Sequence, residues 1–147
     1  MKIIMIGVLA VVITLSAGTT TTKKSTDQEV IAMTILGEAR GEGIAGMYAV
    51  AAVIAQRSIN RSRPPKVICL QPRQFSCWNS GRDLRHLLSG PNAKYAMDLA
   101  KNIKLTNRKV TGFADHFHSV NIKPIPYWAD LNKKTTTINN HVFYKLK

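Results

Sequence analysis

Residues 26–57 read TDQEVIAMTILGEARGEGIAGMYAVAAVIAQR, and this stretch decides the fold. It begins with the spacing of a capping box, in which the Thr26 hydroxyl and the Glu29 side chain each accept a hydrogen bond from a backbone N–H that the helix leaves unpaired. A helix is therefore expected to begin near Asp27.

The glutamate at position 38 continues an apolar row on this predicted helix. Ile31 and Ile35 are four residues apart and Glu38 follows at the next turn, so all three share the face that looks into the protein. A carboxylic acid on an apolar face loses hydration of its charged form, which favours the protonated acid that cleavage of a glycosidic bond requires. The alternative is a glutamate that only hydrogen-bonds the backbone at the helix end.

A second glutamate, Glu42, lies four residues after Glu38 and within about 6 Å of it if the helix continues. Two acids on one side of a sugar cannot act as acid and opposing nucleophile, because these groups flank the bond from different directions. We interpret Glu42 as a supporting residue that pairs with Arg40 or a backbone donor. A salt-bridged helix end without a role in the site is the alternative.

The rest of this stretch predicts a central helix. Gly41 and Gly43 are expected to interrupt the first helix, and a second helix is expected to begin near Ile44. Residues 47–54 (MYAVAAVI) are apolar nearly all round, which is typical of a buried helix. Residues 57–66 (RSINRSRPPK) are expected to form a basic loop.

Further along the chain the signals are shorter. Residues 67–70 form a β-like run, and a third helix is expected from Pro91, with Tyr95, Leu99 and Ile103 as its buried row.

The last third of the chain has the alternation of strands. Residues 116–118 (HFH) and 141–144 (HVFY) predict a small antiparallel sheet, with a turn at Asn139 and Asn140. Helices first and strands later indicate an α+β domain with a helical core.

Composition is consistent with one basic domain. The chain has 147 residues, 21 Lys and Arg against 8 Asp and Glu, a formal charge of +13 and 45% hydrophobic residues. The hydrophobic fraction is too high for a disordered chain, and the length leaves no room for a second sizeable core.

The N-terminus predicts export. Residues 1–18 begin with a charged lysine, continue with an apolar segment and end in small residues at a cleavage site, which are the three parts of a signal peptide. Cleavage is expected after Gly18. Residues 19–25 (TTTTKKS) are expected to form a polar linker, and residues 26–147 the catalytic domain. The alternative is an uncleaved membrane anchor, although the run is shorter than a bilayer needs. After cleavage no stable membrane insertion is expected.

The positive charge predicts an anionic partner. In a secreted protein, in the periplasm or at the cell exterior, the charge points to anionic cell-wall polymers rather than to nucleic acid, and a solvated basic surface without a dedicated patch is the alternative. In such a compartment Cys69 and Cys77 either form a disulfide or remain buried thiols.

Several residues could carry chemistry other than that of Glu38. His116 and His118 share one strand face and could bind zinc together with His141 or Glu38, which would make the protein an amidase. Cys77, within Ser-Cys-Trp, could serve as the nucleophile of a peptidase. A third possibility is a non-catalytic cationic wall-binding protein. We expect neither a metal nor a cofactor.

Tyr127 and Trp128 follow two prolines in an extended stretch that would present their rings. Aromatic faces beside a cleft bind sugar rings by stacking against their C–H bonds, and ordinary core packing is the alternative.

Taken together, these blocks resemble the SleB-type cell wall hydrolases, which include spore cortex-lytic enzymes. The resemblance rests on ILGEARGEG followed by MYAVAAVIAQR, on QPRQFSCWN (71–79), on ADHFHSVNIKPIPYWA (114–129) and on INNHVFYK (138–145), all in family order. It covers the chain from about Thr26 to Lys145.

The resemblance implies a lysozyme-like fold and cleavage of the MurNAc–GlcNAc bond of peptidoglycan glycan strands, by a lytic transglycosylase or a muramidase. It implies that Glu38, the first glutamate of GEARGE, is the catalytic acid. The further candidates for substrate-binding or supporting positions are Glu42, Gln74, Phe75, Trp78, His116, His118, Tyr127 and Trp128.

Overall fold

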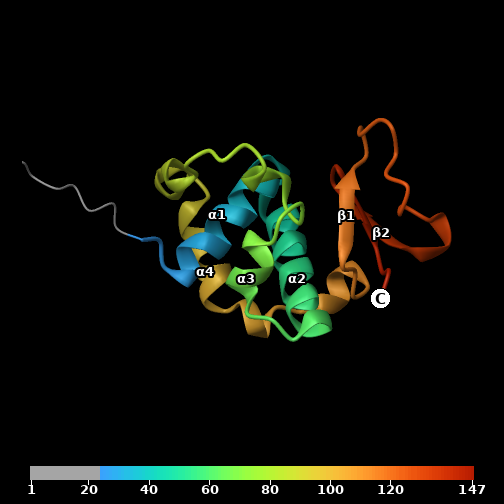
Figure 1. Cartoon of the computed structure of the whole chain (residues 1–147), viewed down its shortest axis with the longest axis horizontal. Coiled ribbons are helices and arrows are strands. Elements are labelled where there is room, and N and C mark those ends of the chain that lie inside the picture. The colour runs from blue at the N-terminus through green and yellow to red at the C-terminus, as the bar shows by residue number, and fades with distance from the viewer. Residues whose placement is uncertain (1–23) are drawn as a thin grey trace, which may run out of the picture.

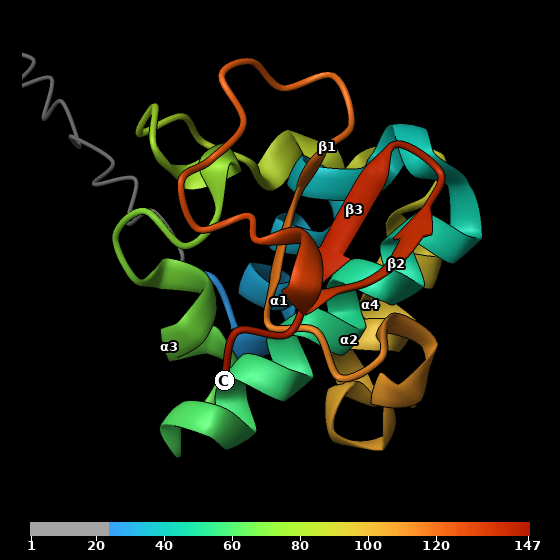
Figure 2. The same ribbon diagram turned by 90° about the vertical axis from the view of Figure 1, so that its right-hand side faces the viewer.

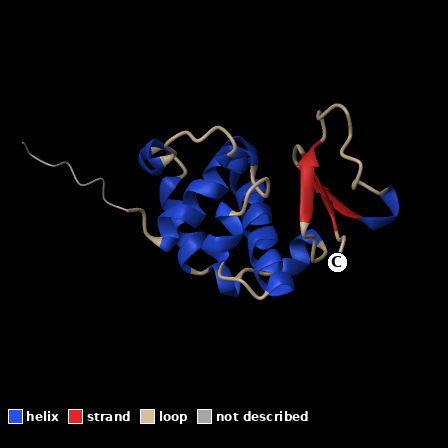
Figure 3. Cartoon of the chain, viewed as in Figure 1, coloured by secondary structure: helices blue, strands red, loops and turns tan. Residues whose placement is uncertain are grey.

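The computed structural model describes residues 24–147, in which helices and a small sheet form two parts that pack against each other (Figures 1 and 3). The predicted signal peptide (1–18) and nearly all of the predicted linker (19–25) lie outside the described residues. Within residues 24–147, no helix combines the length and apolar character needed to cross a membrane.

Helix α1 (Asp27–Ala39) begins as predicted. The Thr26 hydroxyl accepts a hydrogen bond from the Glu29 amide at 3.2 Å, and the Glu29 carboxylate accepts one from the Thr26 amide at 2.7 Å. Residues from Val30 to Leu36 are buried on every side of the helix, so α1 is a core helix whose ends alone reach the surface.

The glycine pair after α1 breaks the helix as expected. A 3-10 turn, η1 (Arg40–Glu42), leads into α2 (Gly43–Arg61), and Gly43 has a φ of +64°, a conformation that favours glycine. From Ala49 to Ile54 every residue of α2 is fully buried, which confirms the predicted central helix.

Two predictions between residues 57 and 70 are wrong. The expected loop from residue 57 is helical as far as Arg61, because nothing in the sequence breaks α2 before Ser62, which adopts a left-handed conformation. The expected β-like run is part of α3 (Pro65–Leu70), where Pro65 takes the first helical position, at which its missing N–H has no cost.

The third predicted helix is shorter than expected. Helix α4 (Ala93–Lys101) begins two residues after Pro91, and Ile103 lies in the separate 3-10 turn η4 (Ile103–Leu105). Leu99 and Ile103 are nevertheless buried against α1 and α2, as the apolar row predicted. Further 3-10 turns are η2 (Ser76–Trp78), η3 (Arg85–Ser89), η5 (Arg108–Thr111) and η6 (Leu131–Lys133).

The predicted sheet is present and antiparallel. Strands β1 (His116–Ser119), β2 (Lys134–Ile138) and β3 (His141–Tyr144) have the order β1-β3-β2, with β3 in the centre, as Figure 2 shows. The expected turn lies between β2 and β3, with Asn139 at a φ of +50°. The sheet packs on α2 through a small second core of Ala49, Val53, Ala114 and Phe143.

Candidate active site

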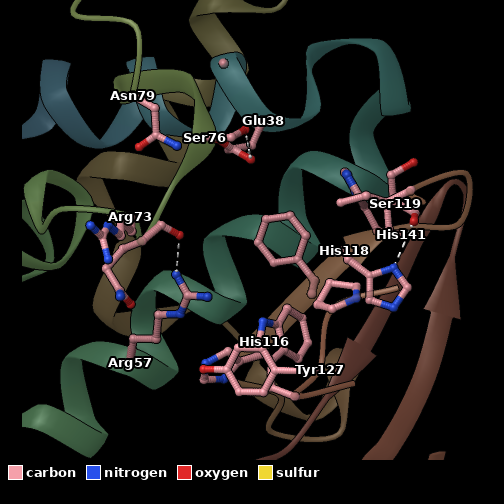
Figure 4. Close-up of a pocket in the computed structure, with 16 residues that line it drawn as sticks. Glu38, Arg57, Arg73, Ser76, Asn79, His116, His118, Ser119, Tyr127 and His141 are labelled. Atoms are coloured by element: carbon pink, nitrogen blue, oxygen red, sulfur yellow. Dashed lines mark hydrogen bonds between the residues drawn. The ribbon is translucent and has the colours of Figure 1, made fainter. Parts of the chain in front are cut away.

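A cavity of about 610 Å³ opens where the C-terminal end of α1 faces the sheet (Figure 4). Its walls come from five parts of the chain: the end of α1, Arg57 of α2, the segment 73–79, strand β1 with the loop that follows it, and β3. The lining residues used below are Gly37, Glu38, Arg57, Arg73, Gln74, Ser76, His116, His118, Tyr127, Trp128 and His141.

Glu38 lies at the end of α1, half-buried, with its carboxylate directed at η2. Oε1 accepts a hydrogen bond from the Cys77 amide at 2.7 Å, and the Ser76 hydroxyl lies 3.1 Å from Oε1 and 3.3 Å from Oε2. The carboxylate is therefore oriented by two donors from one 3-10 turn and stays open to the cavity.

Gly37 permits this arrangement. A Cβ atom at this position would lie 2.5 Å from Cys77 Cβ and 2.9 Å from Cys77 Sγ, closer than side chains approach in folded proteins. The absence of a side chain lets η2 lie against α1, so that its donors reach the neighbouring carboxylate.

A buried polar group supports the opposite wall. Asp115 is 2% exposed, and its carboxylate accepts hydrogen bonds from Asn60 and from the amides of Leu146 and Lys147. His116 Nδ1 lies 2.9 Å from the same carboxylate. Burial acts to raise the pKa of Asp115, but these partners together lower the pKa more, so it falls below its ordinary value.

The histidines of β1 are held in place by their neighbours. The Nδ1 atom of His118 lies 2.8 Å from the Ser119 carbonyl oxygen and Nε2 lies 3.0 Å from the Tyr144 hydroxyl. The Trp128 ring lies against both His116 and His118, with centroid distances of 5.1 and 5.8 Å.

His141 on β3 was considered from the sequence only as a possible zinc ligand and was not selected as a substrate-binding residue, although it belongs to the quoted block INNHVFYK. It lines the cavity, and within residues 24–147 its Nδ1 is the one buried side-chain polar atom without a hydrogen-bond partner. Burial lowers the pKa of His141, and the nearby Glu42 and Glu38 carboxylates oppose that effect only in part.

The structure brings most of the sequence candidates together. Glu38, Gln74, His116, His118, Tyr127 and Trp128 line the cavity. Tyr127 is fully exposed at its rim. The cavity also includes His141, which the sequence analysis named only as a possible zinc ligand, and Arg57, Arg73, Ser76 and Asn79, which it did not select. Three of these, Arg73, Ser76 and Asn79, stand within the quoted block QPRQFSCWN and could have been chosen from it.

Three sequence candidates lie outside the cavity lining. Phe75 is 2% exposed and packs beneath the Arg57 guanidinium, 4.8 Å from it, while the Trp78 indole N–H donates to the Thr34 hydroxyl at 3.0 Å. Both face the core, because η2 turns its other side to Glu38.

Glu42, the third of them, stabilises a turn. Its carboxylate accepts hydrogen bonds from the Asn140 amide at 2.9 Å and from the Asn140 side chain at 3.3 Å. These bonds lower the pKa of Glu42. The residue therefore ties the start of α2 to the β2–β3 turn, with a backbone donor as its partner.

The alternative chemistries find little support in this geometry. Cys69 and Cys77 are free thiols, and burial followed by the Glu38 charge raises the pKa of Cys77. A nucleophilic cysteine acts as a thiolate, which this environment disfavours. In the described part of the chain, no group of three His, Cys, Asp or Glu side chains is placed to hold a metal ion, and both ring nitrogens of His118 have partners.

Two solved structures resemble this chain, and both are catalytic domains of SleB proteins. That of Bacillus cereus SleB superposes with a TM-score of 0.65 at 26% identity, over 81% of this chain and 89% of that one. That of the germination-specific lytic transglycosylase SleB from Bacillus anthracis superposes with a TM-score of 0.64 at 28% identity, over 85% and 98%. No curated protein sequence matches the chain.

The fold is thus the α+β, lysozyme-like fold of these catalytic domains, which defines the class as enzymes that act on peptidoglycan. A family model described as cell wall hydrolase matches residues 41–144, and the chain belongs to this cell wall hydrolase family. The matched range begins just after Glu38.

Proposed function

We propose that this enzyme cleaves the MurNAc–GlcNAc bond of peptidoglycan as a lytic transglycosylase, with Glu38 as its catalytic acid and base. The observation that carries the proposal is that Glu38 is the sole carboxylate among the described residues that line the cavity. The structural neighbour from Bacillus anthracis is itself described as a lytic transglycosylase, which supports the same chemistry here.

A glycosidase that uses water or a covalent intermediate commonly needs two carboxylates that flank the bond, about 5–10 Å apart. Asp115 is no candidate for the second, because its carboxylate is buried and fully engaged with His116, Asn60 and two backbone amides. Glu42 is engaged with the β2–β3 turn. A single carboxylate favours attack by a hydroxyl of the substrate itself.

The contacts of Glu38 indicate which oxygen carries the proton. Oε1 accepts the shorter hydrogen bonds, from the Cys77 amide at 2.7 Å and the Ser76 hydroxyl at 3.1 Å, whereas Oε2 has only the longer Ser76 contact at 3.3 Å, so we place the transferable proton on Oε2. Oε2–H protonates the glycosidic oxygen, the bond from that oxygen to C1 of MurNAc breaks, and GlcNAc leaves with a free hydroxyl. The C6 hydroxyl of MurNAc then bonds to C1 and returns its proton to Glu38. No water is consumed, and the product is a 1,6-anhydro sugar.

The aromatic wall supports binding of sugar rings. Tyr127 is exposed at the rim, and Trp128 stands edge-on against Tyr144 with His116 and His118 beside it. In this proposal the faces of Tyr127 and Trp128 stack against the sugars. The Nδ1–H of neutral His116 faces the Asp115 carboxylate, so its Nε2 accepts a hydrogen bond from a sugar hydroxyl group.

The proposal includes export of the enzyme to the wall. The charged start and apolar run of residues 1–18 and the net charge of +13 support secretion and attraction to anionic wall polymers. The N-terminal sequence of the protein recovered outside the cytoplasm tests this part, and it is expected to begin at Thr19. Recovery of the uncleaved chain from membranes would instead support an anchor.

Mass spectrometry of the soluble products from purified peptidoglycan tests the reaction. Muropeptides that end in 1,6-anhydro-MurNAc are expected. Reducing ends would show hydrolysis and require a second base. Intact glycan with freed peptides would overturn the assignment of Glu38, and sensitivity to a chelator or to iodoacetamide would then separate a zinc amidase from a cysteine peptidase.

A further inference from the structure

One side of the cavity carries positive charge that no carboxylate neutralises by direct contact. Arg57 and Arg73 both line the cavity, and Arg57 donates to the carbonyl oxygen of Gln74, the residue that follows Arg73. In Figure 4 both lie on the side away from His118 and His141.

Arg57 is a buried cation with neutral hydrogen-bond partners. The residue is 5% exposed, and its Nε and Nη1 donate to the backbone carbonyl oxygens of Asp115 and Gln74 at 2.6 and 2.9 Å. Burial, and then the charge of Arg61, lower the pKa of Arg57 to about 10 against the opposing charges of Asp115 and Glu38, which still leaves it charged at neutral pH. The side chain lines the cavity, so its charge acts on whatever enters.

Arg73 is the exposed member of the pair. It lines the cavity with a φ of +62°, and among the described residues its guanidinium has neither a hydrogen bond nor an ion pair. The nearby carboxylates are engaged elsewhere, since Glu38 accepts from η2 and Asp115 accepts from His116 and the C-terminal amides.

A second group in the cavity responds to the same charge. The pKa of His116 is lowered, first by burial and then, against the opposing effect of Asp115, by the charges of Arg57 and Arg61. The charge of Arg57 thus reaches His116, which follows Asp115, the residue whose carbonyl oxygen accepts from Arg57.

We propose that Arg57 and Arg73 form a subsite for a carboxylate of the peptide stem carried by the muramic acid. The inference rests on the proposed cleavage of the glycan strand. It adds that the enzyme recognises the peptide stem as well as the sugars. The N-acetyl sugars are neutral and bring no charge to balance two cations, whereas the peptide attached to the lactyl group brings carboxylates close to the scissile bond. Guanidinium groups bind carboxylates through paired hydrogen bonds.

The test compares two forms of one substrate. Peptidoglycan is first freed of teichoic acid with hydrofluoric acid, so that phosphate groups are absent. Half is then treated with carbodiimide and ammonium chloride to convert its carboxylates to neutral amides. The full chain and the variants Arg73→Gln, Arg73→Lys and Arg82→Gln are assayed on both forms, with kcat and KM measured from anhydro-muropeptide release. Arg82 is an exposed arginine that does not line the cavity, so it controls for the loss of one charge.

Amidation is expected to raise KM of the unaltered enzyme about tenfold with little change in kcat, which corresponds to about 1.4 kcal/mol. On both forms of the substrate, Arg73→Gln is expected to have a KM close to that of the unaltered enzyme on the amidated form, so amidation changes the KM of this variant little. Arg73→Lys is expected to retain part of the preference, and Arg82→Gln to behave as the unaltered enzyme.

Three results would count against the subsite. Equal KM values of the unaltered enzyme on both substrates would overturn it and leave the proposed function intact. The same amidation penalty in Arg73→Gln as in the unaltered enzyme, or an equal loss in Arg82→Gln, would reduce the effect to general electrostatics. Absence of glycan products from either substrate would overturn the proposed function, and the subsite with it.

Discussion

At the scale of single residues, the candidate site depends on how one carboxylate is presented. Glu38 is held by the Cys77 amide and the Ser76 hydroxyl, both from a turn that α1 can approach closely only through Gly37. The orientation of the carboxylate is therefore set by one backbone amide and one hydroxyl of η2, and Oε2 has only the longer of the Ser76 contacts, at 3.3 Å.

The variant Glu38→Gln is expected to fold normally and to lose at least about a hundredfold in activity, because the amide oxygen still accepts both hydrogen bonds but the side chain has no acidic proton. Product release from peptidoglycan and the midpoint of thermal unfolding are the measurements. Asp98→Asn is the control, since Asp98 is an exposed carboxylate on α4 paired with Lys94. Retained wall lysis in Glu38→Gln would show that another residue is the acid.

Sequence reasoning placed Glu38 on an inward position of α1, and the structure has it lining the cavity, although α1 is buried on every side rather than on one apolar face. Its catalytic role stays a prediction. Sequence reasoning could not find Arg57. The basic stretch that begins there is typical of a solvated loop, and only the packing of α2 against Phe75 and the sheet reveals a buried cation at the cavity. The sequence also could not show that Phe75 and Trp78 lie outside the cavity. Their side chains face the core because η2 presents Ser76 and the Cys77 amide to Glu38.

At the scale of elements, the contact between α1 and η2 has no space for a side chain at position 37. In Gly37→Ala the added methyl group would meet Cys77, so η2 must move away and its donors must leave Glu38. We expect a loss of about 1–3 kcal/mol in the free energy of unfolding together with reduced activity. Urea unfolding and product release are to be measured on the same sample.

The matched control is Gly41→Ala in η1. A Cβ atom there meets nothing within 4 Å, so this variant is expected to keep its activity and to change stability little. Equal effects of the two substitutions would show that the α1–η2 contact is not the cause.

The sheet gives the stability of the protein a dependence on pH through His141. This histidine is 7% exposed and its pKa is lowered below the ordinary value of 6.5, so the unfolded chain takes up the proton first as the pH falls. The protonated form is therefore favoured in the unfolded state, and stability decreases on acidification below about 6.5.

The urea midpoint is accordingly expected to decrease between pH 7.5 and 5.5, and His141→Gln to weaken this decrease. Part of the dependence remains in the variant because the pKa of His116 is lowered as well. The same pH dependence in the variant and the unaltered protein would rule out His141 as its source.

At the scale of the whole molecule, we expect the positive charge to govern the encounter with the wall. The net charge is +13 for the whole sequence and one unit lower once Lys2 is removed with residues 1–18. Attraction to an anionic polymer is screened over about 8–10 Å at 0.1–0.15 M salt. Activity on whole walls is therefore expected to decrease as salt rises, mainly through KM, whereas cleavage of a short glycan fragment without peptides changes little.

The same salt series separates an enzyme from a non-catalytic cationic protein. Wall binding by Glu38→Gln is expected to follow salt as in the unaltered protein, without release of products. Wall disruption by this variant that depends on salt alone would instead support the cationic protein.

The sequence by itself determined the capped α1, the buried α2, the small antiparallel sheet and the placement of Glu38 on an inward row. Each of these follows from local periodicity and capping, which depend on residues a few positions apart. Only the tertiary structure decided that the segment from Val67 to Leu70 is helical, that Glu42 belongs to a turn, and that Arg57, Arg73 and His141 join Glu38 in one cavity. These facts depend on contacts between residues far apart in the chain. Such contacts set the burial and the electrostatic environment of a side chain, and local sequence patterns do not predict them.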